Sequence, residues 1–149
     1  MILLTAFALI AALGLLAFIR LAPSDPAVWH LSPVTVAEAG PGRCLAAIVK
    51  QQNGARAACL SQDDPATLLA RLDQFAMASP NTTRLVGSPD TGRITWITRS
   101  ALIGFPDYTT AEATQTPIGS RLDIYARQRF GNGDWGVNAA RLTHWLKDF

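Results

Sequence analysis

The chain has 149 residues, with 13 lysines and arginines against 11 aspartates and glutamates, a formal net charge of +2. Beyond Arg20, the first charged residue, 12 basic and 11 acidic side chains remain, and this balance excludes the strongly basic surface that nucleic-acid binding requires. His30 and His144 lie far apart and the two cysteines form no CxxC pair, so we expect no metal site and no cofactor.

Residues 1–19 carry no charged side chain. As a helix this segment would be roughly 28 Å long, close to the bilayer core of about 30 Å. A secretory signal would have a basic start and a shorter apolar run, and the residues around Arg20 make a poor cleavage site. We therefore predict a single transmembrane anchor over residues 1–21. A cleaved signal and a buried core helix are the alternatives.

The side of the membrane is only weakly encoded. The positive charges that flank the apolar segment are nearly balanced, so the preference of basic residues for the cytoplasm gives little direction. Two cysteines favour an oxidising compartment for the soluble part. We expect the C-terminal domain to lie outside the cytoplasm.

Residues 22–42 are rich in proline and glycine, and we predict an extended tether that leads away from the bilayer. Trp29 and His30 fall within it. Their amphipathic rings are suited to the headgroup layer, although packing against the domain is the interpretation we prefer.

Cys44 and Cys59 enclose fourteen residues, and a disulfide closing such a loop would stabilise the fold by roughly 3 kcal/mol in the chain-entropy model. Two small buried residues are the alternative. Asn53-Gly54 is a strong signal for a two-residue hairpin turn, which would set Cys44 opposite Asp63. The tight turn and the bridge exclude each other unless the turn is wider or the segment is helical.

Further along, Asp64-Pro65 predicts a helix start, because aspartate caps free N–H groups and proline suits the first helical position. Strands follow over 83–87, 93–100 and 121–130, with one strand ending near 104–106, another beginning near Tyr108, and a loop over 115–119. A helix over about 137–147 closes the chain. We predict an α+β domain over residues 43–149, an antiparallel sheet with helices packed on one face.

Gly131 to Gly136 fits the G-x-G-x-x-G pattern of dinucleotide sites. Only thirteen residues follow, too few for the strand and acidic residue that such a site needs, so we expect no nucleotide. The alternative is a glycine-rich turn into a helix capped by Asp134 or Asn138. Asn138 falls on the apolar arc of that helix, so we expect it to satisfy buried backbone groups.

The strand over 121–130 alternates between apolar and polar residues, with Gln128 as the exception. Leu122, Ile124 and Ala126 share one face, whereas the odd-numbered residues, arginines 127 and 129 among them, share a face that we expect to be solvated. Arg127 and Arg129 precede the last helix, and both arginine forks and helix N-termini favour anions. The alternative is local pairing of Arg121 with Asp123 and of Arg129 with Asp134.

The stretches ITRSALIGFPDYTTAEA and SRLDIYARQRFGNGDWGVNAARL resemble the domain-of-unknown-function 1499 family over roughly residues 60–149. Members typically show an arginine-serine and arginine-rich strand that runs into an Asp-x-Gly-x-Asn-x-x-Arg ending. This chain departs upstream, where Pro41-Gly42-Arg43-Cys44 stands in place of a segment with two cysteines. The resemblance, which includes compact membrane-tethered members from α-proteobacteria, implies a fold and a location and no reaction. The matching residues are Arg127, Arg129, Asp134, Asn138 and Arg141.

These observations predict a non-catalytic domain on the periplasmic side of a bacterial inner membrane, acting as a binding or accessory component of a membrane protein assembly. The G-x-S-x-G elbow of a serine hydrolase does not occur in the sequence. The alternative is a domain that binds a small anion or a lipid headgroup, using the arginine-rich strand and the start of the last helix.

Overall fold

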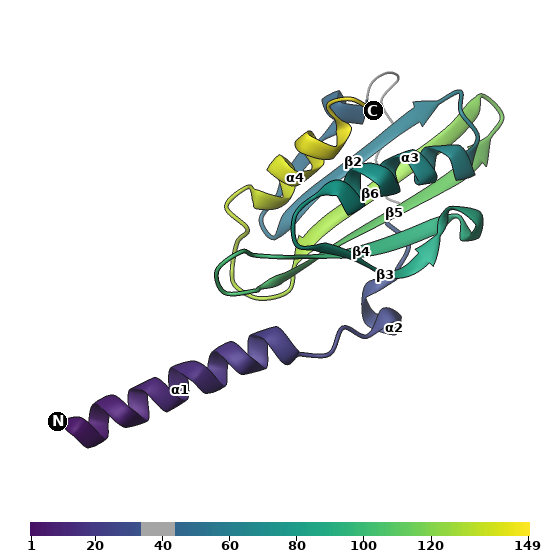
Figure 1. The fold of residues 1–149 in the computed structure, drawn as a ribbon. Coiled ribbons are helices and arrows are strands. Elements are labelled where there is room, and N and C mark those ends of the chain that lie inside the picture. The colour runs from purple at the N-terminus through teal and green to yellow at the C-terminus, as the bar shows by residue number, and fades with distance from the viewer. Residues whose placement is uncertain (34–43) are drawn as a thin grey trace.

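The structure, a computed structural model, describes residues 1–33 and 44–149. Helix α1 (Ile2–Leu21) projects away from the rest of the molecule (Figure 1). Its mean hydropathy is 2.8 and only 6% of its apolar window is buried. The helix is therefore long and apolar enough to cross a membrane, and it is not a core helix of this domain.

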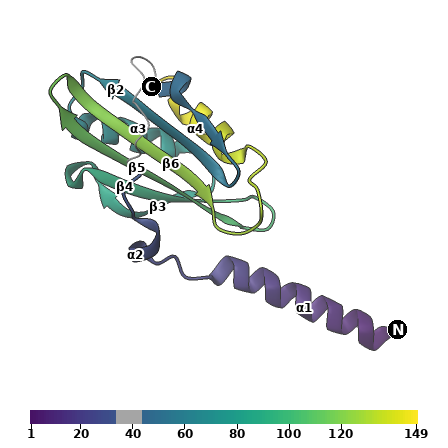
Figure 2. The same cartoon turned by 180° about the vertical axis from the view of Figure 1, so that it is seen from behind.

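Six antiparallel strands form one sheet in the order β1-β2-β6-β5-β4-β3. Helices α3 and α4 both cover the same face of it, as the two opposite views show (Figures 1 and 2). The predicted α+β architecture, with helices on one side of an antiparallel sheet, is confirmed. The elements are β1 (Val49–Gln51), β2 (Gly54–Ser61), α3 (Pro65–Ala78), β3 (Thr82–Ser88), β4 (Arg93–Arg99), β5 (Pro106–Thr116), β6 (Gly119–Gln128) and α4 (Val137–Leu146), with short 3-10 turns η1 (Cys44–Ala47) and η2 (Pro89–Thr91).

The main core lies between the sheet and the two helices. Leu122, Ile124 and Ala126 of β6 face it and are buried, as their alternation predicted. Trp96 of β4 meets Trp145 of α4 edge to face, with ring centroids 5.6 Å apart. Buried indole N–H groups need partners, and both have one. Trp96 donates to Asp73 and Trp145 donates to Ser79.

Several element ends differ from the prediction. Helix α3 begins as expected, with the Asp64 carboxylate accepting from the Thr67 backbone N–H at 3.0 Å. Strand β4 ends at Arg99 and a turn follows, whereas we expected a strand to continue to 104–106. The predicted loop over 115–119 is only a two-residue connection. Gly119 makes it possible, since its φ is +130° and a Cβ there would lie 2.3 Å from the Ser61 carbonyl oxygen.

The hairpin register is shifted from the one that Asn53-Gly54 predicted. Gln51 pairs with Gly54, so Gln52 and Asn53 form the turn and Gly54 already belongs to β2. A Cβ on Gly54 would lie 2.2 Å from the Ala126 carbonyl oxygen of β6. The glycine therefore serves the close approach of two strands, and this tertiary requirement overrides the local turn signal.

A disulfide joins Cys44 to Cys59, with 5.0 Å between their Cα atoms. It coexists with the tight hairpin because the chain leaves the ladder before Val49. Residues 44–47 form η1, which turns Cys44 back toward β2. This is the helical case that the sequence left open. The bridge ties η1 to the core side of the sheet, where both cysteines are buried.

The opposite face of the sheet is covered by residues 22–33, which we call the strap. We expected residues 22–42 to be extended and to lead away from the bilayer; residues 34–43 lie outside the described part of the chain. Within the strap, Pro26–Trp29 form one helical turn, α2, capped by Asp25. Trp29 stacks on Tyr108 of β5, with ring centroids 3.8 Å apart, so it packs on the domain as preferred.

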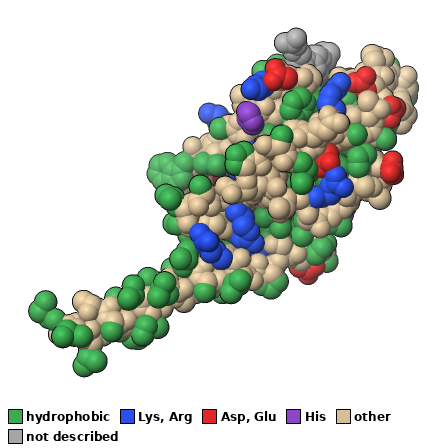
Figure 3. Space-filling model, in the orientation of Figure 1, with side chains coloured by type: hydrophobic (Ala, Val, Ile, Leu, Met, Phe, Trp, Pro, Cys, Tyr) green, Lys and Arg blue, Asp and Glu red, His purple; other side chains and the backbone are tan. Residues whose placement is uncertain are grey.

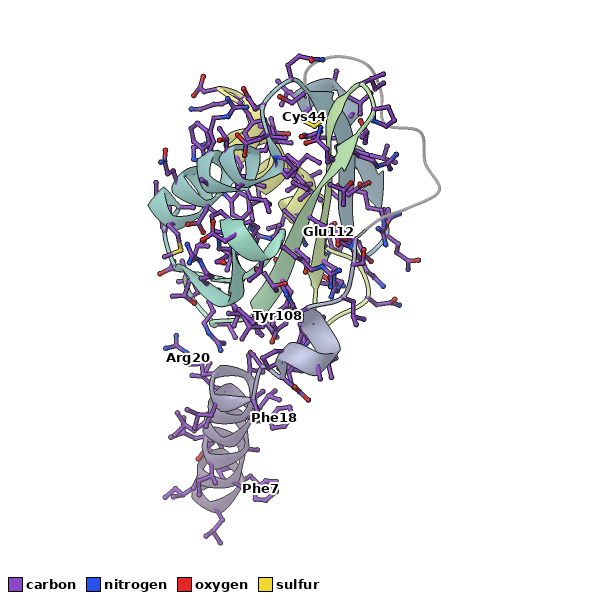
Figure 4. The ribbon with its side chains drawn as sticks, turned by 90° about the vertical axis from the view of Figure 1, so that its right-hand side faces the viewer. Phe7, Phe18, Arg20, Cys44, Tyr108 and Glu112 are labelled. Carbon is purple, nitrogen blue, oxygen red and sulfur yellow. A yellow bond between two sulfur atoms is a disulfide. The ribbon has the colours of Figure 1, made fainter. Side chains whose placement is uncertain are left out.

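Polar contacts continue along the strap. His30 Nδ1 lies 2.9 Å from the Thr95 hydroxyl, which in turn lies 2.9 Å from the Thr110 hydroxyl. Further on, Ser32 donates to Glu112, and Figure 4 shows Tyr108 beside α2 and Glu112 farther along the sheet. The face that we expected to be solvated is therefore largely covered, because its polar groups bind the strap.

The strap should loosen in acid. Burial lowers the pKa of His30, and Arg93 adds to this effect against the opposing influence of Glu112. A histidine whose pKa is lower in the folded protein stabilises it fully above about pH 6.5, and that contribution is lost as pH falls further. We expect amide hydrogen exchange in residues 27–33 to accelerate between pH 7.5 and 5, after correction for intrinsic exchange. The variant His30→Gln should lose most of this pH dependence. Equal acceleration in both proteins would contradict the prediction.

Candidate functional site

The five residues singled out from the sequence lie on two opposite faces of the sheet. Arg127 and Arg129 are on the strap side, where both donate to main-chain carbonyls of the strap. Asp134, Asn138 and Arg141 lie on the helix side, at the start of α4. The structure therefore brings together the last three residues and separates them from the two arginines. We expected the arginines of β6 and the N-terminus of α4 to form one anion site, and the structure does not form it.

The two strand arginines hold the strap. Arg127 donates to the Trp29 carbonyl at 2.9 Å and lies over the Trp29 ring, and burial lowers the pKa of its guanidinium. Arg129 donates to the Pro23 carbonyl at 2.8 Å and to the Tyr108 hydroxyl at 3.1 Å. Their geometry resembles that of structural arginines more than that of an open anion site.

Of the two local ion pairs considered as an alternative, Arg121 with Asp123 is present. The guanidinium donates to both carboxylate oxygens at 2.6 and 2.7 Å, and Asp123 is 1% exposed. This hydrogen bonding raises the pKa of Arg121. The expected pair of Arg129 with Asp134 is not formed, because Asp134 points to the start of α4.

Asp134 already occupies the N-terminus of α4. Its carboxylate accepts from the backbone N–H of Gly136 at 2.9 Å and from that of Asn138 at 3.0 Å. These are N–H groups that would otherwise bind an anion or water. An external anion would have to displace a buried carboxylate, so the helix N-terminus is capped internally rather than open to a ligand.

Asn138 and Arg141 fasten α4 to the sheet. Arg141 donates to Asp107 of β5 at 2.9 Å and to the Asn138 side-chain oxygen, so Asn138 accepts from a side chain and not, as expected, from buried backbone groups. Asn138 is fully buried, and among the described residues its Nδ2 atom has no hydrogen-bond partner. Burial raises the pKa of Asp107, although Arg141 opposes the shift.

A hollow of about 360 Å³ opens beside this cluster, where Asp107 and Arg141 form part of its wall. Aromatic side chains from two loops complete it, namely Phe105, Phe130 and Trp135. Trp135 is 99% exposed and has a φ of +53°, a conformation that few side chains adopt without a constraint.

A second hollow, of about 440 Å³, lies where α1 meets the domain. Arg20 and Arg99 line it together with the polar side chains of Asn81, Thr83 and Ser100. Arg20 donates to the carbonyls of Leu102 and Ile103, and Arg99 donates to that of Gly104. Figure 4 shows Arg20 and Phe18 at this junction, and Figure 3 shows basic side chains next to it. In the described part of the chain, two arginines therefore flank an open polar space at this junction.

In the described ranges 1–33 and 44–149, no three His, Cys, Asp or Glu side chains lie close enough together to hold a metal ion. Comparison with protein families gives a match over residues 30–149 to the family described as a protein of unknown function, DUF1499. The chain belongs to the DUF1499 family. The match begins at His30 of the strap, farther upstream than the resemblance seen in the sequence. A comparison with curated proteins finds no match.

Sequence reasoning found the motif of this DUF1499 domain but missed the junction with α1. Arg20 was recognised only as the end of an apolar run, and Arg99 as part of a strand. Their proximity depends on a turn at 101–103 whose carbonyls accept from Arg20. The one local sign of this junction was the apolar pair Leu102-Ile103, which we had assigned to a strand.

Removing Arg141 should destabilise the domain by about 3 kcal/mol or more, because Asp107 would keep a buried charge without its partner. We expect Arg141→Ala to lower the free energy of unfolding in urea by this amount at pH 8. The loss should shrink at pH 5, since a carboxyl whose folded pKa is raised takes up a proton as pH falls and stops being a buried charge.

Two further variants make the comparison specific. Asp107→Asn combined with Arg141→Ala should recover part of the loss. Lys147→Ala removes an exposed ion pair with Asp148 and should cost less than about 1 kcal/mol at either pH. A loss in Arg141→Ala that is equally small, or independent of pH, would contradict a structural role for the pair.

Proposed function

We propose that this DUF1499 protein is a membrane-anchored, non-catalytic domain on the periplasmic side of a bacterial inner membrane, where it serves as an accessory component of a protein assembly. The observation that carries the proposal is the double attachment of the domain to the end of α1. Arg20 binds the turn at 101–103, and the strap binds the face of the sheet. A domain held in this way presents one fixed surface to its neighbours at the membrane.

Two other features support the location. Helix α1 exposes nearly all of its apolar side chains, a state that suits lipid or a neighbouring transmembrane helix and not water. The Cys44–Cys59 disulfide suits an oxidising compartment, because thiols in the cytosol are kept reduced. Together they favour an anchor in the inner membrane with the domain in the periplasm.

The accessory role is tested by isolating the tagged full-length protein from native membranes in mild detergent and identifying what accompanies it by mass spectrometry. We expect one or more membrane proteins in stoichiometric amounts. A matched control replaces residues 1–17 with the corresponding part of an unrelated single-span helix and keeps residues 18–149, so that Phe18 and Arg20 still contact the domain. Partners retained by the control dock on the domain, and partners that are lost dock on α1. A monodisperse monomer at native expression levels would contradict the role.

A second candidate function is the binding of a small phosphate-bearing anion or a lipid headgroup, and the hollow between Arg20 and Arg99 favours it. Arg127 and Arg129, which we first expected to form this site, already bind the strap. Arg20 and Arg99 instead flank an open polar space at the end of the proposed anchor, where headgroup phosphates would lie. Arginine suits phosphate because its planar fork presents several donors.

Thermal unfolding of the full-length protein in a neutral detergent tests this candidate. We expect phosphatidylglycerol, and to a smaller extent glycerol phosphate, to raise the melting temperature. Arg99→Gln should abolish this increase relative to its own ligand-free value, whereas Lys147→Gln, an exposed cation at the end of α4, should preserve it. If lipid and glycerol phosphate leave all three proteins unchanged, the hollow does not bind this class of anion.

A further inference from the structure

We propose that the end of the domain next to α1 lies in the interfacial layer of the bilayer, with Leu102, Ile103 and Trp135 inserted among the lipid headgroups. The inference rests on the proposed membrane anchor, since the depth of these residues follows from where α1 ends. It adds a second membrane contact, made by the folded domain, to the one made by α1.

The turn at 101–103 is fixed at the depth of the last turn of α1. Arg20 donates to the Leu102 carbonyl at 2.9 Å and to the Ile103 carbonyl at 3.1 Å. A row of rings adds to these bonds, with the Phe18 centroid 6.2 Å from that of Phe130 and the Phe105 centroid 6.1 Å from the same ring. If α1 spans the membrane, the turn that touches its last turn therefore lies at the membrane surface.

The connections β4–β5 and β6–α4 both lie at the end of the sheet that faces α1 (Figures 1 and 2). Strand β5 begins at this end and β6 returns to it, so the turn at 101–103 and the glycine-rich turn at 131–136 are neighbours. The aromatic hollow that includes Phe105, Phe130 and Trp135 connects them. Both turns therefore lie at the end of the domain that would face the membrane surface.

Large apolar side chains are exposed on these two turns. Leu102 is 88% exposed and Trp135 is 99% exposed, with Ile103 and Val137 also at the surface. Turns facing water usually carry polar residues, and a group of exposed apolar side chains marks a contact with something apolar. Tryptophan in particular favours the boundary between lipid and water, because its ring is apolar and its N–H is polar.

Trp135 is held outward by its backbone. Trp135 has a φ of +53°, and Gly133 and Gly136, on either side of it in the sequence, also have positive φ. The turn is fixed on both sides, since the Asp134 N–H donates to the Gln52 carbonyl and the Val137 N–H donates to the Asp134 carbonyl. The ring is therefore presented to the surroundings by a rigid turn, so inserting it would cost little conformational entropy.

The charges at this end suit an interface with lipid phosphates. Arg20 and Arg99 lie beside the exposed turn. The carboxylates of Asp107 and Asp134 are engaged by Arg141 and by backbone N–H groups, respectively. Asp25, just after α1, accepts from the Ala27 backbone N–H. Cations beside inserted apolar side chains are the combination that binds anionic membrane surfaces.

The opposite end of the sheet provides a matched control. Ile118, in the two-residue connection between β5 and β6, is also exposed, at 66%, but it lies far from α1 along the length of the strands. A lone apolar side chain of this kind is common on soluble surfaces. The proposal therefore predicts different environments for two similar side chains of the same protein.

The test uses full-length protein carrying Leu102→Cys, Trp135→Cys or Ile118→Cys, each labelled with an environment-sensitive fluorophore. The native Cys44 and Cys59 form a disulfide and remain unlabelled. Each protein is reconstituted into vesicles of phosphatidylcholine and phosphatidylglycerol, and flotation shows whether it is anchored. Quenching is then measured with lipids spin-labelled near the headgroup and, separately, with iodide in the aqueous phase.

We expect all three proteins to float, with the labels at 102 and 135 quenched by lipid and shielded from iodide, and the label at 118 quenched by iodide only. Floating proteins whose three labels are all quenched by iodide alone would overturn the proposal and leave the anchor intact. Labels at 102 and 135 that are shielded from both quenchers would also overturn it, because a protein surface or a second copy would then cover the turns. Proteins that do not float would refute the membrane anchor itself.

Discussion

The attachment of the strap to the sheet is the interaction on which the rest of this molecule depends, because the strap continues directly from α1 and covers one face of the sheet. The Trp29 carbonyl accepts from Arg127 and from the Thr110 hydroxyl, and the Trp29 ring stacks on Tyr108. Without these contacts, a six-stranded sheet with helices on one side would leave a row of threonine and arginine side chains facing water. The strap satisfies that row with backbone carbonyls and carries the chain from α1 onto the sheet.

This arrangement gives the residues of the family's C-terminal ending structural roles, whereas the open polar space lies at the junction with α1. The DUF1499 motif residues Asp134, Asn138 and Arg141 cap α4 and fasten it to β5, while Arg127 fastens the strap. Each of these charges is committed to a partner within the chain. The open polar space is lined by Arg20 and Arg99, which donate to main-chain carbonyls of residues 102–104 and lie outside the Asp-x-Gly-x-Asn-x-x-Arg ending. The Asp-x-Gly-x-Asn-x-x-Arg ending therefore has a structural role in this chain.

The parts of the fold that depend on local periodicity could be predicted from the sequence, and the parts that depend on distant contacts could not. Alternation identified β6 and its buried face, and Asp64-Pro65 identified the start of α3. The Asn53-Gly54 signal misled, because Gly54 is needed where β2 approaches Ala126. The packing of Trp29 on the domain was the preferred interpretation, but the course of the strap was not predicted. Five of its hydrogen bonds are accepted by backbone carbonyls, which every residue has, so the side chains of 22–33 do not show which residues of the sheet they meet.

The two attachments of the domain also constrain what a membrane partner would meet. Arg20 is the only charged side chain in α1, and a free arginine at a helix end would extend toward the headgroups. Here Arg20 donates two hydrogen bonds to the turn at 101–103. Rotation of the domain about α1 would break these bonds and the ring contact of Phe18 with Phe130. If α1 spans a membrane, a domain that resists such rotation keeps the same edge toward the bilayer. The edge strand β3 and the outer surfaces of α3 and α4 then face directions fixed relative to α1. Fixed directions of this kind are what the proposed accessory role requires, because they let the domain contact one neighbour in a defined orientation.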